Sequence, residues 1–202
     1  MRRRGSRLRK IDALVANWKF EGNLIEEIFG NNGIGTATYG PGKIGDCAIF
    51  DGITNDIATE NTDALKLQKG TIMGWVKTTG NPTEKGLFVK TSSYGLYIRD
   101  NNLAAFSYGS PSEWHLTNVN IATNTWRHVA QTFEFDVINK TKYYVDGILV
   151  LTATLRFSND NHDLQIASNT SSARFTGSID DVRIYNIILS GEEILQIYNS
   201  AN

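Results

Sequence analysis

Short runs of β-branched and aromatic residues, each followed by a turn signal, recur along most of this sequence. Glycine, asparagine and aspartate cluster between the runs, and these residues accept the backbone angles that tight reversals require. Many strands with almost no helical pattern predict a β-sandwich or a β-barrel. The predicted strands are Ala13–Phe20, Asp46–Phe50, Thr71–Lys77, Gly86–Lys90, Gly95–Arg99, Trp126–Phe133, Lys142–Val145, Ile148–Thr152 and Arg174–Tyr185.

Two further elements follow from local signals. The Asp146-Gly147 dipeptide between two of the predicted strands is the strongest hairpin signal in the chain, because type I′ turns need two residues that tolerate positive φ. Ser190 followed by Glu193 matches a capping box, in which each side chain accepts a hydrogen bond from the other residue's backbone N–H. Ile194 then begins an apolar face, so we predict one short helix near the C-terminus.

The size of the chain is consistent with one hydrophobic core. It has 202 residues, of which 41% are hydrophobic, and a chain of this length buries enough surface to fold without covalent crosslinks. Cys47 is the single cysteine, which excludes an intrachain disulfide. No stretch approaches the ~20 consecutive apolar residues of a membrane helix, so we expect no membrane span.

The charge is unevenly distributed along the chain. Six of the 20 basic residues lie within residues 1–10, which leaves 14 basic against 21 acidic residues in the rest. We therefore divide the sequence into a basic N-terminal arm, residues 1–12, and a folded domain, residues 13–202. The arm is either a solvated leader or a segment that docks on a partner, since like-charge runs often serve as interaction tails. Its basic residues are Arg2, Arg3, Arg4, Arg7, Arg9 and Lys10.

Several separated motifs resemble those of one known family. They are Trp18-Lys19-Phe20-Glu21-Gly22, Gly42-Lys43-Ile44-Gly45, Phe50-Asp51-Gly52, Gly74-Trp75-Val76-Lys77, Trp126-Arg127-His128-Val129-Ala130, Tyr144-Val145-Asp146-Gly147 and Gly177–Asn186. Their order, from about Ala13 to Tyr198, is similar to that of laminin-G-like domains in the concanavalin A-like lectin/glucanase superfamily. The resemblance implies an all-β, two-sheet antiparallel jelly-roll sandwich with one short C-terminal helix. It says little of function, because such folds host lectins, adhesion modules, enzymes and structural proteins.

A catalytic motif known from this superfamily is incomplete here. Laminarinase-type hydrolases carry Glu-x-Asp-x-x-Glu, in which the first Glu is the nucleophile and the last is the acid/base. The matching segment, Glu134-x-Asp136-x-x-Asn139, ends in an amide, which cannot donate the proton that retaining hydrolysis requires. The family pattern also places a reversal there. We therefore expect that the protein is not an enzyme, and a glycoside hydrolase is the least favoured alternative.

Acidic residues in several motifs point to calcium. The domains that this chain resembles often hold calcium near the sheet rim, and calcium takes six to eight oxygen ligands. In the last predicted strand Asp180 alternates with Val182, so it points inward if that face is the core, where a carboxylate needs hydrogen bonds, a cation or a metal. The alternative is that Asp51 starts a turn and Asp180 accepts backbone hydrogen bonds. The candidate ligands are Glu21, Asp51, Asp56, Asp180 and Asp181.

One tryptophan differs from the other three in its surroundings. Trp114 lies in the polar segment Ser110–His115, where a large ring has no evident reason to be buried. Aromatic rings beside polar groups are what a sugar-binding face offers. We predict a stacking wall, with Asn101 and Asn102 as further polar partners; the alternative is a face covered by another part of the chain or by a neighbour. The predicted ligand-binding residues are Tyr94, Tyr97, Tyr108, Glu113, Trp114 and His115.

Together these features favour a noncatalytic binding module that recognises a carbohydrate, such as a cell-surface polysaccharide, and acts in adhesion. The alternative is a structural or attachment component of a larger assembly, such as a virus or phage particle, anchored to a protein partner through residues 1–10. Both hypotheses favour the extracellular surface or a virion. We expect no sequence-specific nucleic-acid binding, because the sequence has no basic stripe outside the arm.

Overall fold

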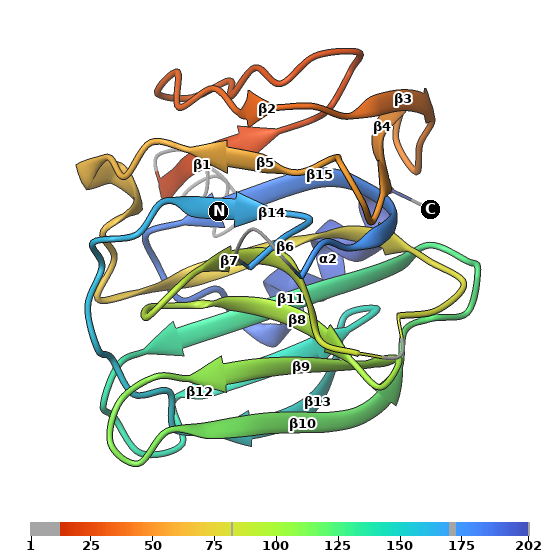
Figure 1. Cartoon of the computed structure of the whole chain (residues 1–202). Coiled ribbons are helices and arrows are strands. Elements are labelled where there is room, and N and C mark those ends of the chain that lie inside the picture. The colour runs from red at the N-terminus through yellow and green to blue at the C-terminus, as the bar shows by residue number, and fades with distance from the viewer. Residues whose placement is uncertain (1–12, 82, 170–172, 202) are drawn as a thin grey trace, which may run out of the picture.

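The strands form two antiparallel sheets that lie one behind the other (Figure 1). The computed structural model describes residues 13–81, 83–169 and 173–201. The first sheet has the order β13-β12-β11-β6-β15-β4-β3, with β1 also paired to β15. Its strands are β1 (Leu14–Trp18), β3 (Thr38–Pro41), β4 (Asp46–Asp51), β6 (Lys69–Lys77), β11 (Arg127–Glu134), β12 (Thr141–Val145), β13 (Ile148–Ala153) and β15 (Thr176–Tyr185).

The second sheet faces the viewer in Figure 1 and has the order β10-β9-β8-β7-β14-β5-β2. Its strands are β2 (Ile34–Gly35), β5 (Ile57–Thr59), β7 (Lys85–Lys90), β8 (Gly95–Arg99), β9 (Asn102–Ser107), β10 (Glu113–Asn120) and β14 (Leu164–Ile166). A short 3₁₀ helix, η1 (Asp63–Leu65), precedes β6, and the helix α2 (Gly191–Ser200) follows β15.

The main hydrophobic core fills the space between the two sheets. Each strand contributes the side chains of one face, as the two-residue period of a strand requires. Burying one such large apolar side chain stabilises the fold by about 1.5–3 kcal/mol. The largest fully buried members of this core are Trp18, Phe20, Phe50, Phe88, Tyr94, Phe133, Tyr143 and Phe175. The predicted jelly-roll sandwich is therefore confirmed.

The predicted hairpin and helix are both present. Asp146 and Gly147 have φ of 52° and 77° between β12 and β13, the positive angles that a type I′ turn needs. Ser190 caps α2 with the reciprocal hydrogen bonds of a capping box to Glu193. Ile194 of α2 packs on the outer face of the first sheet, so this helix covers apolar side chains that would otherwise meet water.

Strands β9 and β10 were not predicted from the sequence. In β10 the side chains of His115 and Thr117 are buried, whereas Trp114 is half-buried and Leu116 is exposed. Over residues 114–117 this strand therefore points polar side chains inward and apolar ones outward, the reverse of the usual alternation. The reversal hid the strand from pattern analysis. It also gives the second sheet an apolar outer face.

Residues 1–12, the predicted basic arm, lie outside the described residues. In the part of the chain that the structure describes, no helix is both long enough and apolar enough to cross a membrane.

Candidate functional site

An aromatic cluster lies on the outer face of the second sheet. Trp114 of β10 stands directly opposite Phe106 of β9, and their ring centroids are 5.0 Å apart. Tyr97 of β8 meets the Trp114 ring edge-on, with the centroids 5.4 Å apart. Tyr108 lies 4.8 Å from Phe106, also edge-on. Such edge-to-face contacts fix the orientation of the rings. Three neighbouring strands therefore hold one rigid aromatic surface.

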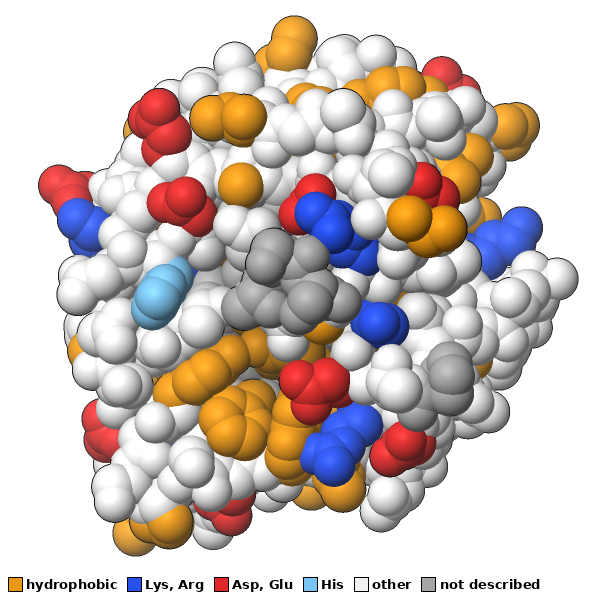
Figure 2. Space-filling view, in the orientation of Figure 1, with side chains coloured by type: hydrophobic (Ala, Val, Ile, Leu, Met, Phe, Trp, Pro, Cys, Tyr) orange, Lys and Arg blue, Asp and Glu red, His pale blue; other side chains and the backbone are white. Residues whose placement is uncertain are grey.

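This cluster lines a pocket of about 410 Å³, a size suited to a small ligand. Glu84, Thr91 and Asn169 add polar groups to its wall. The hydroxyls of Tyr97 and Tyr108 are hydrogen-bonded to each other, which orients both rings. Figure 2 shows hydrophobic side chains gathered on this face, with acidic and basic side chains beside them. The pocket thus combines apolar rings with a few convergent polar groups.

A cation holds the tryptophan from one side. The guanidinium carbon of Arg99 lies 4.6 Å from the centroid of the Trp114 ring, which is a cation–π contact. Because Arg99 and Tyr97 are alternate residues of β8, both side chains project from the same face of the sheet. Trp114 is therefore supported on several sides and needs little rearrangement to meet a ligand.

The structure brings three predicted ligand-binding residues into this pocket, namely Tyr97, Tyr108 and Trp114. Glu113 begins β10 and is exposed, but it is not among the residues that line the pocket. Asn101 and Asn102 lie at the turn into β9 and also do not line it.

The prediction is wrong for Tyr94 and His115, which both lie inside the sandwich. The Tyr94 ring stacks on Phe133, and its hydroxyl donates to the carbonyl of Leu65 at 2.9 Å. His115 Nδ1 lies 2.7 Å from the buried Tyr143 hydroxyl, and burial lowers the pKa of the imidazole. His115 occupies an inward position of β10 and Tyr94 points inward from the turn before β8, so neither can reach a ligand on the outer face.

Sequence analysis missed Phe106, Glu84, Thr91 and Asn169. Phe106 lies in a strand that we did not predict, and the other three lie at or beyond strand ends. The signal that could have found Phe106 is an apolar residue alternating with the buried Leu103 and Ala105, which places it on the opposite face. The remaining three come together only through the tertiary fold.

Three of the five predicted metal ligands already have partners of another kind. The Asp51 carboxylate accepts hydrogen bonds from the Thr54 hydroxyl and from the backbone N–H groups of Ile53, Thr54 and Asn55, which hold its pKa below the usual range. It therefore starts a turn, as the alternative interpretation proposed. Two other candidate ligands form ion pairs, Asp56 with Arg174 and Asp181 with Arg183.

The expected orientation of Asp180 within its strand is wrong. Asp181 has φ of 49°, and the register of β15 with β6 shifts between Asp180 and Arg183. This β-bulge places Ile179 and Val182 in the core, so Asp180 faces outward beside Trp75. It is nevertheless fully buried, because the β3–β4 turn covers it.

Asp180 and Glu21 both bind this turn. Asp180 Oδ2 accepts the backbone N–H groups of Lys43 and Ile44, and Glu21 Oε2 accepts that of Asp46. A β-carbon at position 42 would lie 2.7 Å from Asp180 Oδ2, and one at position 45 would lie 2.2 Å from Glu21 Oε1. Glycine at both positions therefore lets the two carboxylates approach the backbone.

One oxygen at this turn is buried without a partner. Among the described residues nothing hydrogen-bonds to Asp180 Oδ1, and burial raises the pKa of this carboxyl to about 6. The described residues contain no group of three His, Cys, Asp or Glu side chains that could hold a metal ion. Glu21 and Asp180 are what remains of the predicted calcium set, and further ligands would be carbonyls and water.

The hydrolase-like segment forms a reversal, as expected. Glu134 ends β11, and Asp136 and Asn139 lie in the loop before β12 with φ of 59° and 57°. This loop belongs to the first sheet, whereas the aromatic pocket lies on the outer face of the second.

Two packed antiparallel sheets define a jelly-roll β-sandwich, with an aromatic pocket on one outer face. The profile described as the Concanavalin A-like lectin/glucanases superfamily (Laminin_G_3) matches residues 51–195, and the chain belongs to this family. The resemblance stated from the sequence motifs is therefore confirmed. The sequence matches no curated protein.

Solved structures share the fold at low sequence identity. Domain 4 of AbnA, a GH43 extracellular arabinanase from Geobacillus stearothermophilus, in complex with arabinotriose, is 23% identical with a TM-score of 0.76, over 92% of this chain and 98% of that one. The binding domain of Paraclostridial Mosquitocidal Protein 1 is 16% identical with a TM-score of 0.75, over 94% and 52%.

The receptor binding domain of botulinum neurotoxin C/D mosaic serotype is 16% identical with a TM-score of 0.71, over 94% and 51%. This chain thus spans about half the length of these two binding domains. At these identities the likeness is one of fold.

Proposed function

We propose that this domain is a noncatalytic carbohydrate-binding module and that a sugar stacks in the aromatic pocket. The observation that carries the proposal is the cluster of Tyr97, Phe106, Tyr108 and Trp114, held on an outer sheet face around a pocket of about 410 Å³. Aromatic side chains that gather around a surface pocket, three of them half-buried, mark a candidate binding site. Sugars suit this one, because their C–H faces pack on rings while their hydroxyls need polar partners.

The polar groups of the pocket match the second requirement. The Glu84 carboxylate accepts hydrogen bonds, the Asn169 side chain carries an amide, and the Thr91 hydroxyl, which donates to the Asn169 carbonyl, can still accept. A sugar ring in the pocket could therefore exchange its bound water for these partners. The arabinanase domain that shares this fold was solved in complex with arabinotriose, so this trisaccharide is the first probe.

Replacing Trp114 with alanine should weaken glycan binding at least tenfold, which corresponds to about 1.4 kcal/mol, because the largest stacking surface is lost. Binding is measured by titration calorimetry with arabinotriose and on a glycan array. Leu116→Ala is the matched control, since Leu116 lies two residues further along β10 on the same face and does not line the pocket. Its binding should equal that of the wild type. Equal binding by Trp114→Ala of a demonstrated ligand would contradict the site.

The lining of the pocket supports binding without catalysis. Glycoside hydrolysis by the common mechanisms needs two carboxyl groups that flank the scissile bond. Among the described residues that line the aromatic pocket, Glu84 is the one carboxylate. The purified domain should therefore bind an oligosaccharide without releasing reducing sugar from it.

A calcium ion at the β3–β4 turn is a separate proposal. It is supported by the unpartnered Asp180 Oδ1, which a cation would satisfy, and by the nearby carboxylate of Glu21. The bound ion would neutralise buried negative charge and fix the turn between two strands of the first sheet. Its role would be structural, because the turn does not line the aromatic pocket.

Saturating calcium should raise the melting temperature by roughly 5 °C or more relative to EDTA, since a ligand at 100 times its Kd adds about 2.7 kcal/mol. Differential scanning fluorimetry measures the shift. Asp180→Asn should abolish it, because an amide keeps the acceptor for the turn but lacks the charge. Asp56→Asn, whose native carboxylate pairs with Arg174, should retain it. An unchanged wild-type melting temperature rules the ion out.

A further inference from the structure

A second pocket adjoins the aromatic pocket on the same outer face. It has a volume of about 380 Å³, and Thr91 and Asn169 line both pockets. The Thr91 hydroxyl donates to the backbone carbonyl of Asn169 at 3.2 Å, so these two residues form the boundary that the pockets share. A ligand that outgrows the aromatic pocket on this side meets the second pocket next.

The two pockets lie over different strands of the sheet. Strands β8, β9 and β10 supply the rings of the first pocket. The second is lined by Asp56, just before β5, by His162 and Asp163, just before β14, and by Arg174. Gln165 of β14 also lines the second pocket, and β7 lies between β8 and β14, so the pockets follow one another across the strands.

The chemistry of the second pocket is polar and acidic. Asp56 and Asp163 contribute carboxylates, and Glu84 adds a third in the adjoining pocket. Arg174 Nε lies 3.3 Å from Asp56 Oδ1, so these two charges offset each other, and the net negative charge of the second pocket comes from Asp163. Ionised carboxylates accept hydrogen bonds from hydroxyl groups and repel other anions. The surface therefore suits an uncharged, hydroxyl-rich chain and disfavours uronic, sialic or sulfated sugars.

We propose that the two pockets are successive subsites for one neutral oligosaccharide, with one unit stacked in the aromatic pocket and the chain continuing past Thr91 and Asn169 into the acidic pocket. This inference rests on the proposed function and adds to it a direction, a minimum length of two units and a charge preference. The aromatic subsite provides affinity, and the acidic subsite selects neutral chains over charged ones.

The test uses the neutral glycan that gives the strongest signal on the array. Its mono-, di-, tri- and hexasaccharide are titrated into the protein. A homologue that ends in a uronic acid is titrated in the same way. The wild type should bind the longer chains at least tenfold more tightly than the monosaccharide and should disfavour the acidic homologue. Asp163→Ala should remove most of the gain in affinity that the wild type shows with chain length. Asp163 is exposed, so its replacement should not affect folding.

Matched variants distinguish a failure of the two-subsite inference from a failure of the aromatic sugar site. Glu192→Ala removes an exposed carboxylate from α2, on the far side of the first sheet, and should behave as the wild type. Trp114→Ala should weaken binding of every chain length. If Trp114→Ala abolishes binding while affinity is independent of length, or if acidic glycans bind best, the two-subsite inference is wrong and the aromatic site stands. If no glycan binds the wild type, both are wrong.

Discussion

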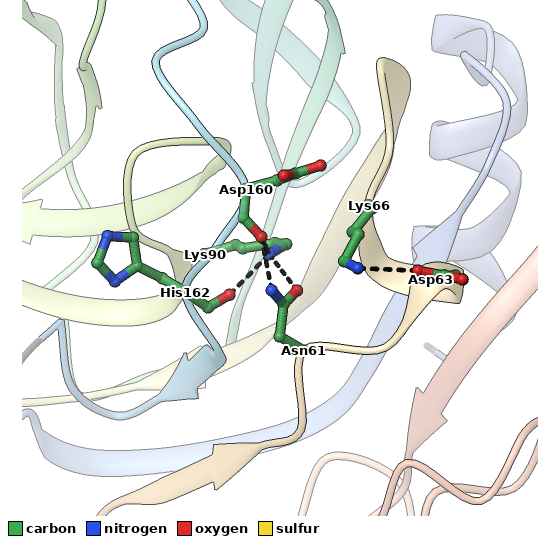
Figure 3. A network of polar contacts seen from close by, with 6 residues as sticks. All are labelled: Asn61, Asp63, Lys66, Lys90, Asp160 and His162. Carbon is green, nitrogen blue, oxygen red and sulfur yellow. Dashed lines mark hydrogen bonds and ion pairs between the residues drawn. The ribbon is translucent and has the colours of Figure 1, made fainter.

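Replacing Lys90 with methionine should lower the free energy of unfolding by about 2–4 kcal/mol. Lys90 is completely buried, and its ammonium donates to Asn61 Oδ1, to the carbonyl of Asp160 and to the carbonyl of His162, at 2.7, 2.7 and 2.6 Å (Figure 3). Burial lowers the pKa of Lys90 to about 8, so the charged form still predominates at neutral pH. Methionine has a similar length but leaves all three oxygens without this donor.

The same substitution should disturb the acidic pocket. The segment that contains Asp160 and His162 leads directly into Asp163, and Lys90 ties this segment to the residues that follow β5. Loss of the three hydrogen bonds releases both segments from the end of the sheet. Unfolding in urea, followed by tryptophan fluorescence, measures the change in stability.

Lys66→Met is the matched control for Lys90→Met. Lys66 lies in the same region and pairs with Asp63 at 2.8 Å, but this pair is at the surface (Figure 3). A surface pair of this kind contributes little, so the control should stay within about 0.5 kcal/mol of the wild type. Equal stability of the two variants would show that the Lys90 hydrogen bonds contribute no more than an exposed ion pair.

Acid should destabilise the fold through His128, by up to about 4–5 kcal/mol between pH 6.5 and pH 3. His128 is 1% exposed and packs edge-on against Trp75, and burial lowers its pKa from 6.5 to about 3. Below pH 6.5 the unfolded chain binds a proton that the folded chain does not. The stabilisation is therefore fully present above pH 6.5 and is lost as the pH falls toward 3.

His128→Phe isolates this contribution, because phenylalanine fills the site between Trp75 and Tyr198 but does not titrate. The stability of both proteins is measured in urea from pH 7.5 to pH 3.5. Their difference should be constant above pH 7 and should then change by up to about 1.4 kcal/mol per pH unit, in favour of the variant. Parallel curves over the whole range would exclude His128 as the acid-sensitive group.

The sequence predicted the elements that depend on neighbouring residues. The Asp146-Gly147 turn needs only two residues that adopt positive φ, and the cap of α2 needs only Ser190 and Glu193. All nine predicted strands are present, because alternation and turn residues act within a few positions. Six strands were missed, namely β2, β3, β5, β9, β10 and β14.

The candidate site was predicted only in part, because only some of its residues can be recognised from their neighbours in the sequence. Trp114 was singled out because it lies in a polar segment, and the structure does place its ring on an outer face. Tyr94 lies only three residues before Tyr97, yet it is in the core whereas Tyr97 is in the outer cluster. Residues an odd number of positions apart face opposite sides of a strand, and Tyr94 also lies in the turn before β8. Closeness in sequence is therefore a poor guide to which side of a sheet a ring faces.

By itself, the sequence determined the fold class, the rhythm of strands and turns, the capped helix and the family, since these follow from local conformational preferences and ordered motifs. Only the tertiary structure decided which side chains meet. Strand register set Trp114 opposite Phe106, a bulge turned Asp180 out of the main core, and strand order brought Thr91 and Asn169 between two pockets. Such contacts join residues far apart in the chain, so no local pattern encodes them.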